Sequence, residues 1–357
     1  MNAALVSLGS TSSLMIAEAM KKQFDHVDIL QLKEIEVRLG KEGEILYQQK
    51  LLSHYDCVYL RGSFRYANLL RSIAAMLEGR VPYMPLCTGS FTTVHNKLLT
   101  HLILQQSGIP MPKTYVSPNV EASKKLLKTV RYPIVMKLPE GTQGKGVMFA
   151  DSFSSASSML DALGVLNQPF IIQEYVETGG SDIRALVVGE KVVACMKRVA
   201  KTDEKRANIH TGGIGESVQL SRQAINIAVD TAKALGAEIC GVDILEGSQG
   251  PLVIEANISP GLQGLSKVST IDIPEEIAKY LRRKTEESLS SRVSKKSAEE
   301  VVHESKTESS PFQEIVTELT FRGERVLLPE LATKLARLKE RKEYTISMKK
   351  GKIEIKE

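Results

Sequence analysis

A glycine-rich loop between two apolar strands constrains the fold of this chain more than any other feature. The run PIVMKL precedes this loop and VMFA follows it; the loop itself is Glu140, Gly141, Thr142, Gln143, Gly144, Lys145, Gly146. Its three glycines leave backbone N–H groups accessible to phosphate oxygens, and Lys137 and Lys145 add positive charge. It is not a P-loop, because GxxxxGK[ST] cannot be fitted and a strand follows instead of a helix. The loop predicts a phosphate contact within a hairpin, although glycine-rich hairpins also occur as simple turns.

The order of apolar runs and helical patterns predicts an α/β (α+β) protein. Residues 1–92 alternate short apolar runs with helical patterns, which favours a small α/β domain on a parallel sheet. The turn after the first run reads GSTSS and lacks the GxGxxG of a dinucleotide site. We expect two further subdomains at 93–176 and 177–283. Serine-rich residues 284–310 then predict a flexible linker, and 311–357 a small β/α module of strand, turn, strand, helix and hairpin.

Composition excludes several classes of protein. The 42% hydrophobic and 25% charged residues are typical of a globular chain, and a net charge of +5 is far below that of a dedicated nucleic-acid binder. Four widely spaced cysteines form no zinc or disulfide pattern. There is no run of about 20 apolar residues and no signal-peptide pattern, so we expect a cytoplasmic protein without a membrane span.

A second constellation lies in the predicted hairpin ICGVDILEGSQGPLVIEANIS. Glu255 and Asn257 are two apart on one strand and share a face, and the partner strand is expected to bring Asp243 near them. Carboxylate and amide oxygens without His or Cys are the ligands expected for magnesium shared with substrate phosphates. Two other interpretations remain: acidic residues that face solvent, and an Asn257 that only shapes a turn before Ser259 and Gly261.

Cationic residues gather between the two constellations. A solvated face is the ordinary interpretation of such a run, but its position before a predicted metal hairpin also suits anionic phosphates or carboxylates. The residues are Arg184, Lys197, Arg198, Lys201, Arg206, Asn208 and His210, followed by Gly212 and Gly213.

Seven motifs, in order and spacing, resemble the ATP-grasp ligases of the RimK type: VMKLPEGTQGKGV, IQEYV, SDIRALVVG, KRVAK, RANIHTGG, GVDIL and PLVIEANISPGLQG. The resemblance covers residues 1–283. It implies an ATP-grasp fold and an ATP-dependent carboxylate–amine ligase, in which ATP phosphorylates a carboxylate and an amine attacks the acyl phosphate. RimK-type enzymes add glutamate, so the resemblance also implies ATP, two Mg²⁺ or Mn²⁺ ions, glutamate and an acidic acceptor.

The resemblance assigns roles to individual residues. Asp243, Glu255 and Asn257 would hold the metal. The catalytic set at the transferred phosphoryl group and acceptor would be Arg184, Arg198 and Lys201. The nucleotide contacts would be Lys97, Lys137, Glu140, Gly141, Thr142, Gln143, Gly144, Gly146, Gln173, Glu174, Tyr175, Val176, Asp182, Arg206, Ala207 and Asn208, where Ala207 replaces a polar residue of the family pattern. The substrate contacts would be His210, Gly212, Gly213, Asn257, Ser259 and Gly261.

The acceptor stays open at this stage. We expect glutamate to be added to a protein C-terminus, as in the modification of a ribosomal protein. The alternatives are the same chemistry on a deazaflavin coenzyme or methanopterin, on an amino-group carrier protein, or a regulator whose ATP-grasp core only senses ATP.

Residues 316–357 resemble the swapped-hairpin modules of AbrB and MazE type. Such modules dimerise, which implies a homo-oligomer, and some bind DNA through basic loop residues, here Arg322 and Arg325. A plain dimerisation or docking appendage is the alternative.

Overall fold

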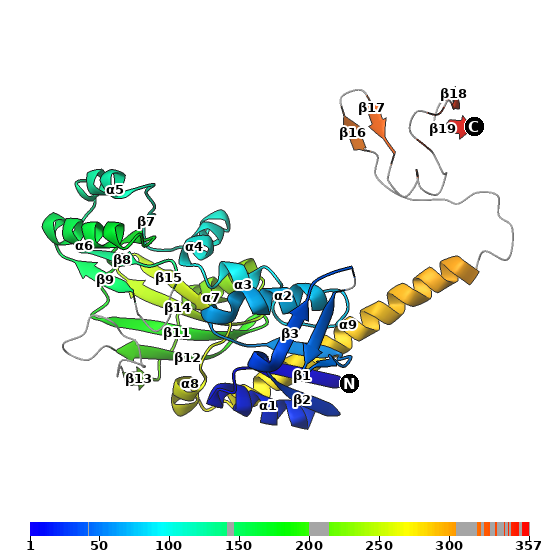
Figure 1. Ribbon diagram of the computed structural model, residues 1–357, viewed down its shortest axis with the longest axis horizontal. Helices are drawn as coiled ribbons and strands as arrows, with labels where there is room; N and C mark the ends of the chain where they lie inside the picture. The colour runs from blue at the N-terminus through cyan, green and yellow to red at the C-terminus, as the bar shows by residue number, and fades with distance from the viewer. Residues whose placement is uncertain are drawn as a thin grey trace. The chain divides into compact units, whose positions relative to one another are not determined.

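The structure is a computed structural model that describes residues 1–41, 43–140, 146–199, 214–304, 320–322, 325–328, 333, 339, 342, 344–349 and 352–356. The chain forms two compact units, Met1–Lys295 and Lys296–Glu357. Within the described ranges, no helix is both long and apolar enough to cross a membrane. In the described residues of the larger unit, four sheets form with their helices (Figure 1).

The N-terminal region contains the expected parallel sheet, in the order β2-β1-β6. Its elements are β1 (Asn2–Ser7), α1 (Thr11–Gln23), β2 (His26–Gln31), β6 (Cys57–Leu60) and α2 (Ala67–Leu77), with the short 3-10 turns η1 (Leu32–Glu34) and η2 (Phe64–Tyr66). Ser10 caps α1 by accepting a hydrogen bond from the Ser13 N–H, so the GSTSS turn starts a helix directly after a buried strand.

A second N-terminal sheet, in the order β3-β4-β5, was not predicted. It comprises β3 (Ile35–Arg38), β4 (Glu44–Tyr47) and β5 (Lys50–Leu51). The β4–β5 turn places Gln48 and Gln49 at φ 49° and 64°. Such turns normally carry Asn or Gly, because other residues seldom adopt positive φ, so this hairpin lacks the usual sequence signal.

The middle of the chain forms the antiparallel sheet β7-β10-β8-β9. It consists of β7 (Thr114–Tyr115), β8 (Ile134–Lys137), β9 (Val147–Ala150) and β10 (Ile171–Glu174), with α5 (Val120–Leu127) and α6 (Phe153–Val165). Leu127 of α5 and Leu160 of α6 pack with Ile134 and Met136 in a core of their own, and Figure 1 shows both helices beside this sheet. α3 (Ser90–Thr93) and α4 (Lys97–Gln106) lead into the sheet from the N-terminal region.

The third region is the five-stranded antiparallel sheet β13-β12-β11-β14-β15. Its elements are β11 (Ser181–Val188), β12 (Lys191–Val199), β13 (Ile214–Glu216), α7 (Arg222–Ala234), β14 (Ile239–Gly247), β15 (Gly250–Asn257) and α8 (Gln263–Val268). Its buried residues and those of the parallel sheet form one continuous core. The expected boundary at 92/93 lies within α3, and that at 176/177 lies between β10 and β11; the division into these subdomains stays a prediction.

The interpretation of residues 284–310 as a flexible linker was wrong for 284–304, because helix α9 runs without a break from Ile273 to Glu304. Thr285 is fully buried, and the Ser288 hydroxyl donates to the Pro82 carbonyl at 2.6 Å. Arg282 and Glu286 form an i,i+4 ion pair at 2.8 Å. These contacts hold serine-rich sequence in a helix, whereas serine content alone favoured a linker.

The smaller unit contains two antiparallel hairpins. β16 (Thr320–Arg322) pairs with β17 (Arg325–Leu327), and β18 (Thr345–Lys349) pairs with β19 (Lys352–Lys356). Both hairpins agree with the predicted order. Arg322 and Arg325 are paired across the first of them.

Candidate active site

The predicted polar residues of the five-stranded sheet lie on one of its faces. The strand register places Asp182 opposite Arg198, Arg184 opposite Asp243, and Asp243 opposite Glu255. Directly opposed residues point to the same side of a sheet, so four neighbouring strands present their charged groups together. This is the juxtaposition of Asp243 with Glu255 that the sequence analysis expected without being able to establish the register.

Two arginines and two aspartates form a buried network on this face. Arg184 donates to both oxygens of Asp243 at 2.7 Å. Arg198 donates from Nε to Asp182 Oδ1 at 2.6 Å and from Nη2 to Asp243 Oδ2 at 2.8 Å. Burial opposes the charge on Asp243, but the two guanidinium groups outweigh burial and lower its pKa to about 2. In this structure, two arginines are the cation partners of the buried Asp243 carboxylate.

A buried lysine lies on the four-stranded sheet. Lys137, the last residue of β8, donates to Gln173 Oε1 at 2.6 Å, and Gln173 Nε2 donates to Thr114 Oγ1 at 2.9 Å. Burial lowers the pKa of Lys137 to about 8, although the Glu255 carboxylate favours its charged form. The electrostatic influence of Glu255 connects this lysine to the charged face of the other sheet.

A cavity of about 510 Å³ brings these groups together. Residues from both sheets and from the N-terminal region line it, and the rings of Phe149 and Tyr175 meet in it edge to face, 6.0 Å apart. Of the residues predicted from sequence, the cavity is lined by Lys97, Lys137, Gln173, Glu174, Tyr175, Val176, Asp182, Arg184, Arg198, Asp243, Glu255, Asn257, Ser259 and Gly261.

Three of the remaining predicted residues are described but do not line the cavity: Glu140, Gly146 and Lys197. Glu140 is exposed, and Gly146 ends the loop at φ 78°, where a Cβ would approach Leu138 to 3.0 Å. Glycine is therefore required at 146 by backbone conformation and space. The others lie outside the described residues: Gly141, Thr142, Gln143, Gly144, Lys145, Lys201, Arg206, Ala207, Asn208, His210, Gly212 and Gly213.

The donor atoms suit a hard divalent cation to different degrees. Glu255 is half-buried, lines the cavity and forms no ion pair with another residue of the described ranges. Asp243 would exchange an arginine for a metal ion. Asn257 Oδ1 accepts the Ser259 N–H at 2.9 Å, which is the turn-shaping role considered above, while its side chain also lines the cavity. Oxygen ligands of this kind fit magnesium, and the assignment of the three as ligands stays a prediction.

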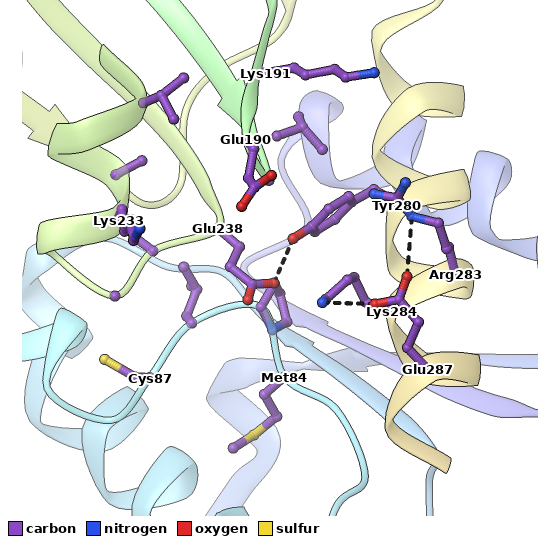
Figure 2. Close-up of a pocket in the computed structure, with 18 of the residues that line it drawn as sticks. Met84, Cys87, Glu190, Lys191, Lys233, Glu238, Tyr280, Arg283, Lys284 and Glu287 are labelled. Atoms are coloured by element: carbon purple, nitrogen blue, oxygen red, sulfur yellow. Dashed lines mark hydrogen bonds and ion pairs between the residues drawn. The ribbon is translucent and has the colours of Figure 1, made fainter. Parts of the chain in front are cut away.

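A larger cavity of about 1050 Å³ lies elsewhere in the same unit, between α7, α9 and residues 78–88 (Figure 2). It contains equal numbers of acidic and basic side chains and none of the residues predicted from sequence. Glu287 pairs with Lys284 at 2.9 Å and with Arg283 at 3.8 Å, and Glu238 accepts a hydrogen bond from the Tyr280 hydroxyl at 2.8 Å. These charges compensate one another. The smaller cavity, where buried cations converge from two sheets, is therefore the candidate active site.

Sequence reasoning missed several lining residues. They are Arg61, Phe149, His95 and the serines of the GSTSS turn, Ser10, Ser12 and Ser13. A charged residue directly after the apolar run CVYL and a helix-capping serine after the first strand were available as signals.

Known proteins resemble this chain in sequence and in fold. The family model described as a RimK-like ATP-grasp domain matches residues 94–281. A probable alpha-L-glutamate ligase of Legionella pneumophila (strain Corby) is 45% identical over 184 residues, which cover 51% of this chain and 61% of the relative. The chain thus spans about three-fifths of that relative's length.

Two other relatives are covered more fully. A ribosomal protein bS6–L-glutamate ligase of Salmonella schwarzengrund (strain CVM19633) is 38% identical over 68% of this chain and 81% of its own. A probable alpha-L-glutamate ligase of Shewanella loihica (strain ATCC BAA-1088 / PV-4) is 33% identical over 76% of this chain and 92% of its own.

Solved structures share the fold. The ATP-grasp ligase PsnB complexed with a minimal precursor superposes with a TM-score of 0.63 at 18% identity, over 79% of this chain and 98% of that chain. A RimK domain ATP-grasp protein from Sphaerobacter thermophilus DSM 20745 gives a TM-score of 0.61 at 18% identity, over 78% and 99%. With a matched domain over half of the sequence and relatives above 30% identity, the chain belongs to the RimK-like ATP-grasp family.

Proposed function

We propose that this protein is an ATP-dependent ligase that adds L-glutamate to the carboxylate of an acidic acceptor, namely a protein C-terminus. The observation that carries the proposal is the cavity in which Lys137 of one sheet meets the arginine–aspartate face of the other. The names of the relatives, all glutamate ligases and one of them specific for a ribosomal protein, support the transferred group and the kind of acceptor.

The reaction needs a leaving group on an otherwise unreactive carboxylate. ATP would transfer its γ-phosphoryl group to the acceptor carboxylate with release of ADP, and the glutamate amine would then attack the acyl carbon and expel phosphate, leaving an amide. Most of the catalysis of such transfers comes from positioning and charge stabilisation. This fits a cavity rich in fixed cations, and no nucleophilic side chain is required.

The residues divide this work between the two sheets. Lys137 would bind ATP phosphates, and Phe149 and Tyr175 offer aromatic surface for the base. Arg184 and Arg198 would stabilise the transferring phosphoryl group. Asp243, Glu255 and Asn257 would hold magnesium, which when bound supplies positive charge to the phosphate oxygens.

The decisive test is a product analysis. The full-length protein would be incubated with ATP, magnesium, labelled glutamate and a peptide that ends in an acidic residue, and the peptide would be weighed. We expect one or more glutamyl additions with matching ADP release. ADP release that does not depend on glutamate, or a peptide of unchanged mass, would contradict the proposal, whereas addition to a small cofactor and not to any peptide would change the acceptor alone.

A further inference from the structure

Arg61 is a buried arginine in the wall of the active-site cavity. It directly follows β6 and is 2% exposed. Its guanidinium group donates to three oxygens: Ser13 Oγ at 3.1 Å, the Tyr59 hydroxyl at 2.9 Å and the Pro260 carbonyl at 2.8 Å. All three acceptors are neutral. Among the residues that the structure describes, no carboxylate forms an ion pair with Arg61.

This environment differs from that of the other two cavity arginines. Arg184 and Arg198 each donate to carboxylates, so their charges are balanced. A buried cation without a counter-charge is costly, and a guanidinium group has five N–H donors, of which three make hydrogen bonds here. A bound anion would supply both the missing charge and the missing acceptors.

The surroundings of Arg61 also favour an anion. Helix α1, 13 residues long, begins beside it, has no acidic residue in its first turn, and places Ser10, Ser12 and Ser13 in the cavity lining. The positive end of the helix dipole and nearby hydroxyl donors both stabilise negative charge. Ser63 and Ser259 add two more hydroxyl groups to the lining.

We infer that Arg61 and the start of α1 bind a carboxylate of the acidic substrate that does not itself react. The proposed function already assigns the phosphate charge to Lys137, Arg184 and Arg198, and the planar fork of a guanidinium group matches the geometry of a carboxylate. The identity of the acidic substrate rests on the proposed function: glutamate carries two carboxylates and reacts through its amine. A glutamyl residue at the end of an acceptor also carries a carboxylate that does not react, and the test distinguishes this carboxylate from those of free glutamate.

The test measures the preference for an acid over its amide. The full-length protein, with magnesium and a non-hydrolysable ATP analogue, would be titrated with glutamate, glutamine and glutamic acid α-amide, and in a second arm with the dipeptide Glu-Glu and its amides. The variants are Arg61→Gln, Arg61→Lys and, as a matched control, Arg65→Gln, since Arg65 is exposed and absent from the lining.

We expect Arg61→Gln to weaken binding of the acid by about 10- to 100-fold while binding of the corresponding amide changes little. Arg61→Lys should restore part of the preference, and Arg65→Gln should stay within about twofold of wild type. If Arg61→Gln loses the preference for glutamate over its amides, the subsite binds the incoming amino acid. If it loses the preference for Glu-Glu over its amides, the subsite binds the acceptor tail. Unchanged affinity for the ATP analogue would show that the variant is folded.

Two results would overturn the inference. One is an equal loss for acid and amide in Arg61→Gln, which would make Arg61 only a clamp on Pro260. The other is a wild-type protein that binds no acid more tightly than its amide. If the preference depends on Arg61 but wild type shows no glutamate-dependent ADP release, the proposed function fails and the carboxylate subsite stands.

Discussion

Replacing Asp243 by asparagine would test the buried network at the centre of the site. Asp243 accepts three charge-assisted hydrogen bonds, two from Arg184 at 2.7 Å and one from Arg198 at 2.8 Å. Asparagine at this position could still accept two of them, but the two arginines would keep only Asp182 as a counter-charge. Removing one partner of a buried ion pair costs about 3–5 kcal/mol, and the retained bonds favour the lower end, about 3 kcal/mol.

The matched control is Glu255→Gln, which removes the paired carboxylate on the adjacent strand. Because Glu255 is half-buried and forms no ion pair in the described ranges, its loss should change the free energy of unfolding by less than about 1 kcal/mol. Urea unfolding of the full-length protein would give both values, and ADP release would report the metal role that we predict for both residues.

The reasoning fails if the free energy of unfolding of Asp243→Asn stays within about 1 kcal/mol of wild type, because the arginines would then not depend on this carboxylate. Full ADP release by Glu255→Gln with magnesium would separately refute its role as a metal ligand.

Three further predictions follow from the geometry. Burial lowers the pKa of Lys137 to about 8, so its positive charge is lost as pH rises through that value. Fluorescence titrations of the wild-type protein should therefore show weaker ATP binding at about pH 9 than at pH 7. Lys137→Met should not show this pH dependence. The same shift makes protonated Lys137 oppose folding below about pH 8, a cost that disappears as pH rises towards 10.5. In thermal unfolding, Gly189→Ala should lower stability by about 2 kcal/mol or more, because the added Cβ would overlap the Tyr280 ring of α9. The control is Gly108→Ala, which has the same φ of 65° but open space around it and should cost about 1 kcal/mol. Truncation after Glu304 should preserve the stability of the larger unit, but truncation after Arg283 should lower its urea midpoint, since it removes the buried threonine and the α9 hydrogen bonds to residues 79–82.

The hairpin predicted to bind metal shows how far sequence reasoning reaches. Glu255 and Asn257 share a face by strand periodicity alone, but the position of Asp243 opposite Glu255 depends on how β14 and β15 align, with a bulge after Asp243. Register is set by the turn and by packing, neither of which the local pattern encodes. The arginine partners of Asp243 come from β11 and β12 and needed the whole sheet.

Elements with local signals were predicted and those stabilised by distant contacts were missed. The apolar run PIVMKL, for example, is a local signal that marks β8. The middle of α9 is held by a hydrogen bond from Ser288 to Pro82, about 200 positions earlier. The environment of Arg61 likewise depends on Pro260, about 200 positions later. No window of sequence contains both partners.

The join between the N-terminal region and the loop after β15 has a consequence for synthesis of the chain. Arg61 contacts Pro260, Gly62 donates to Ser259, and Leu262 donates to Ser12, across separations of 199, 197 and 250 residues. Ribosomes add about 5–20 residues per second, so about 10–50 s separate the emergence of the first partner from the last. The first 60 residues can form their parallel sheet early, but this wall of the cavity cannot close until nearly three-quarters of the protein has been made.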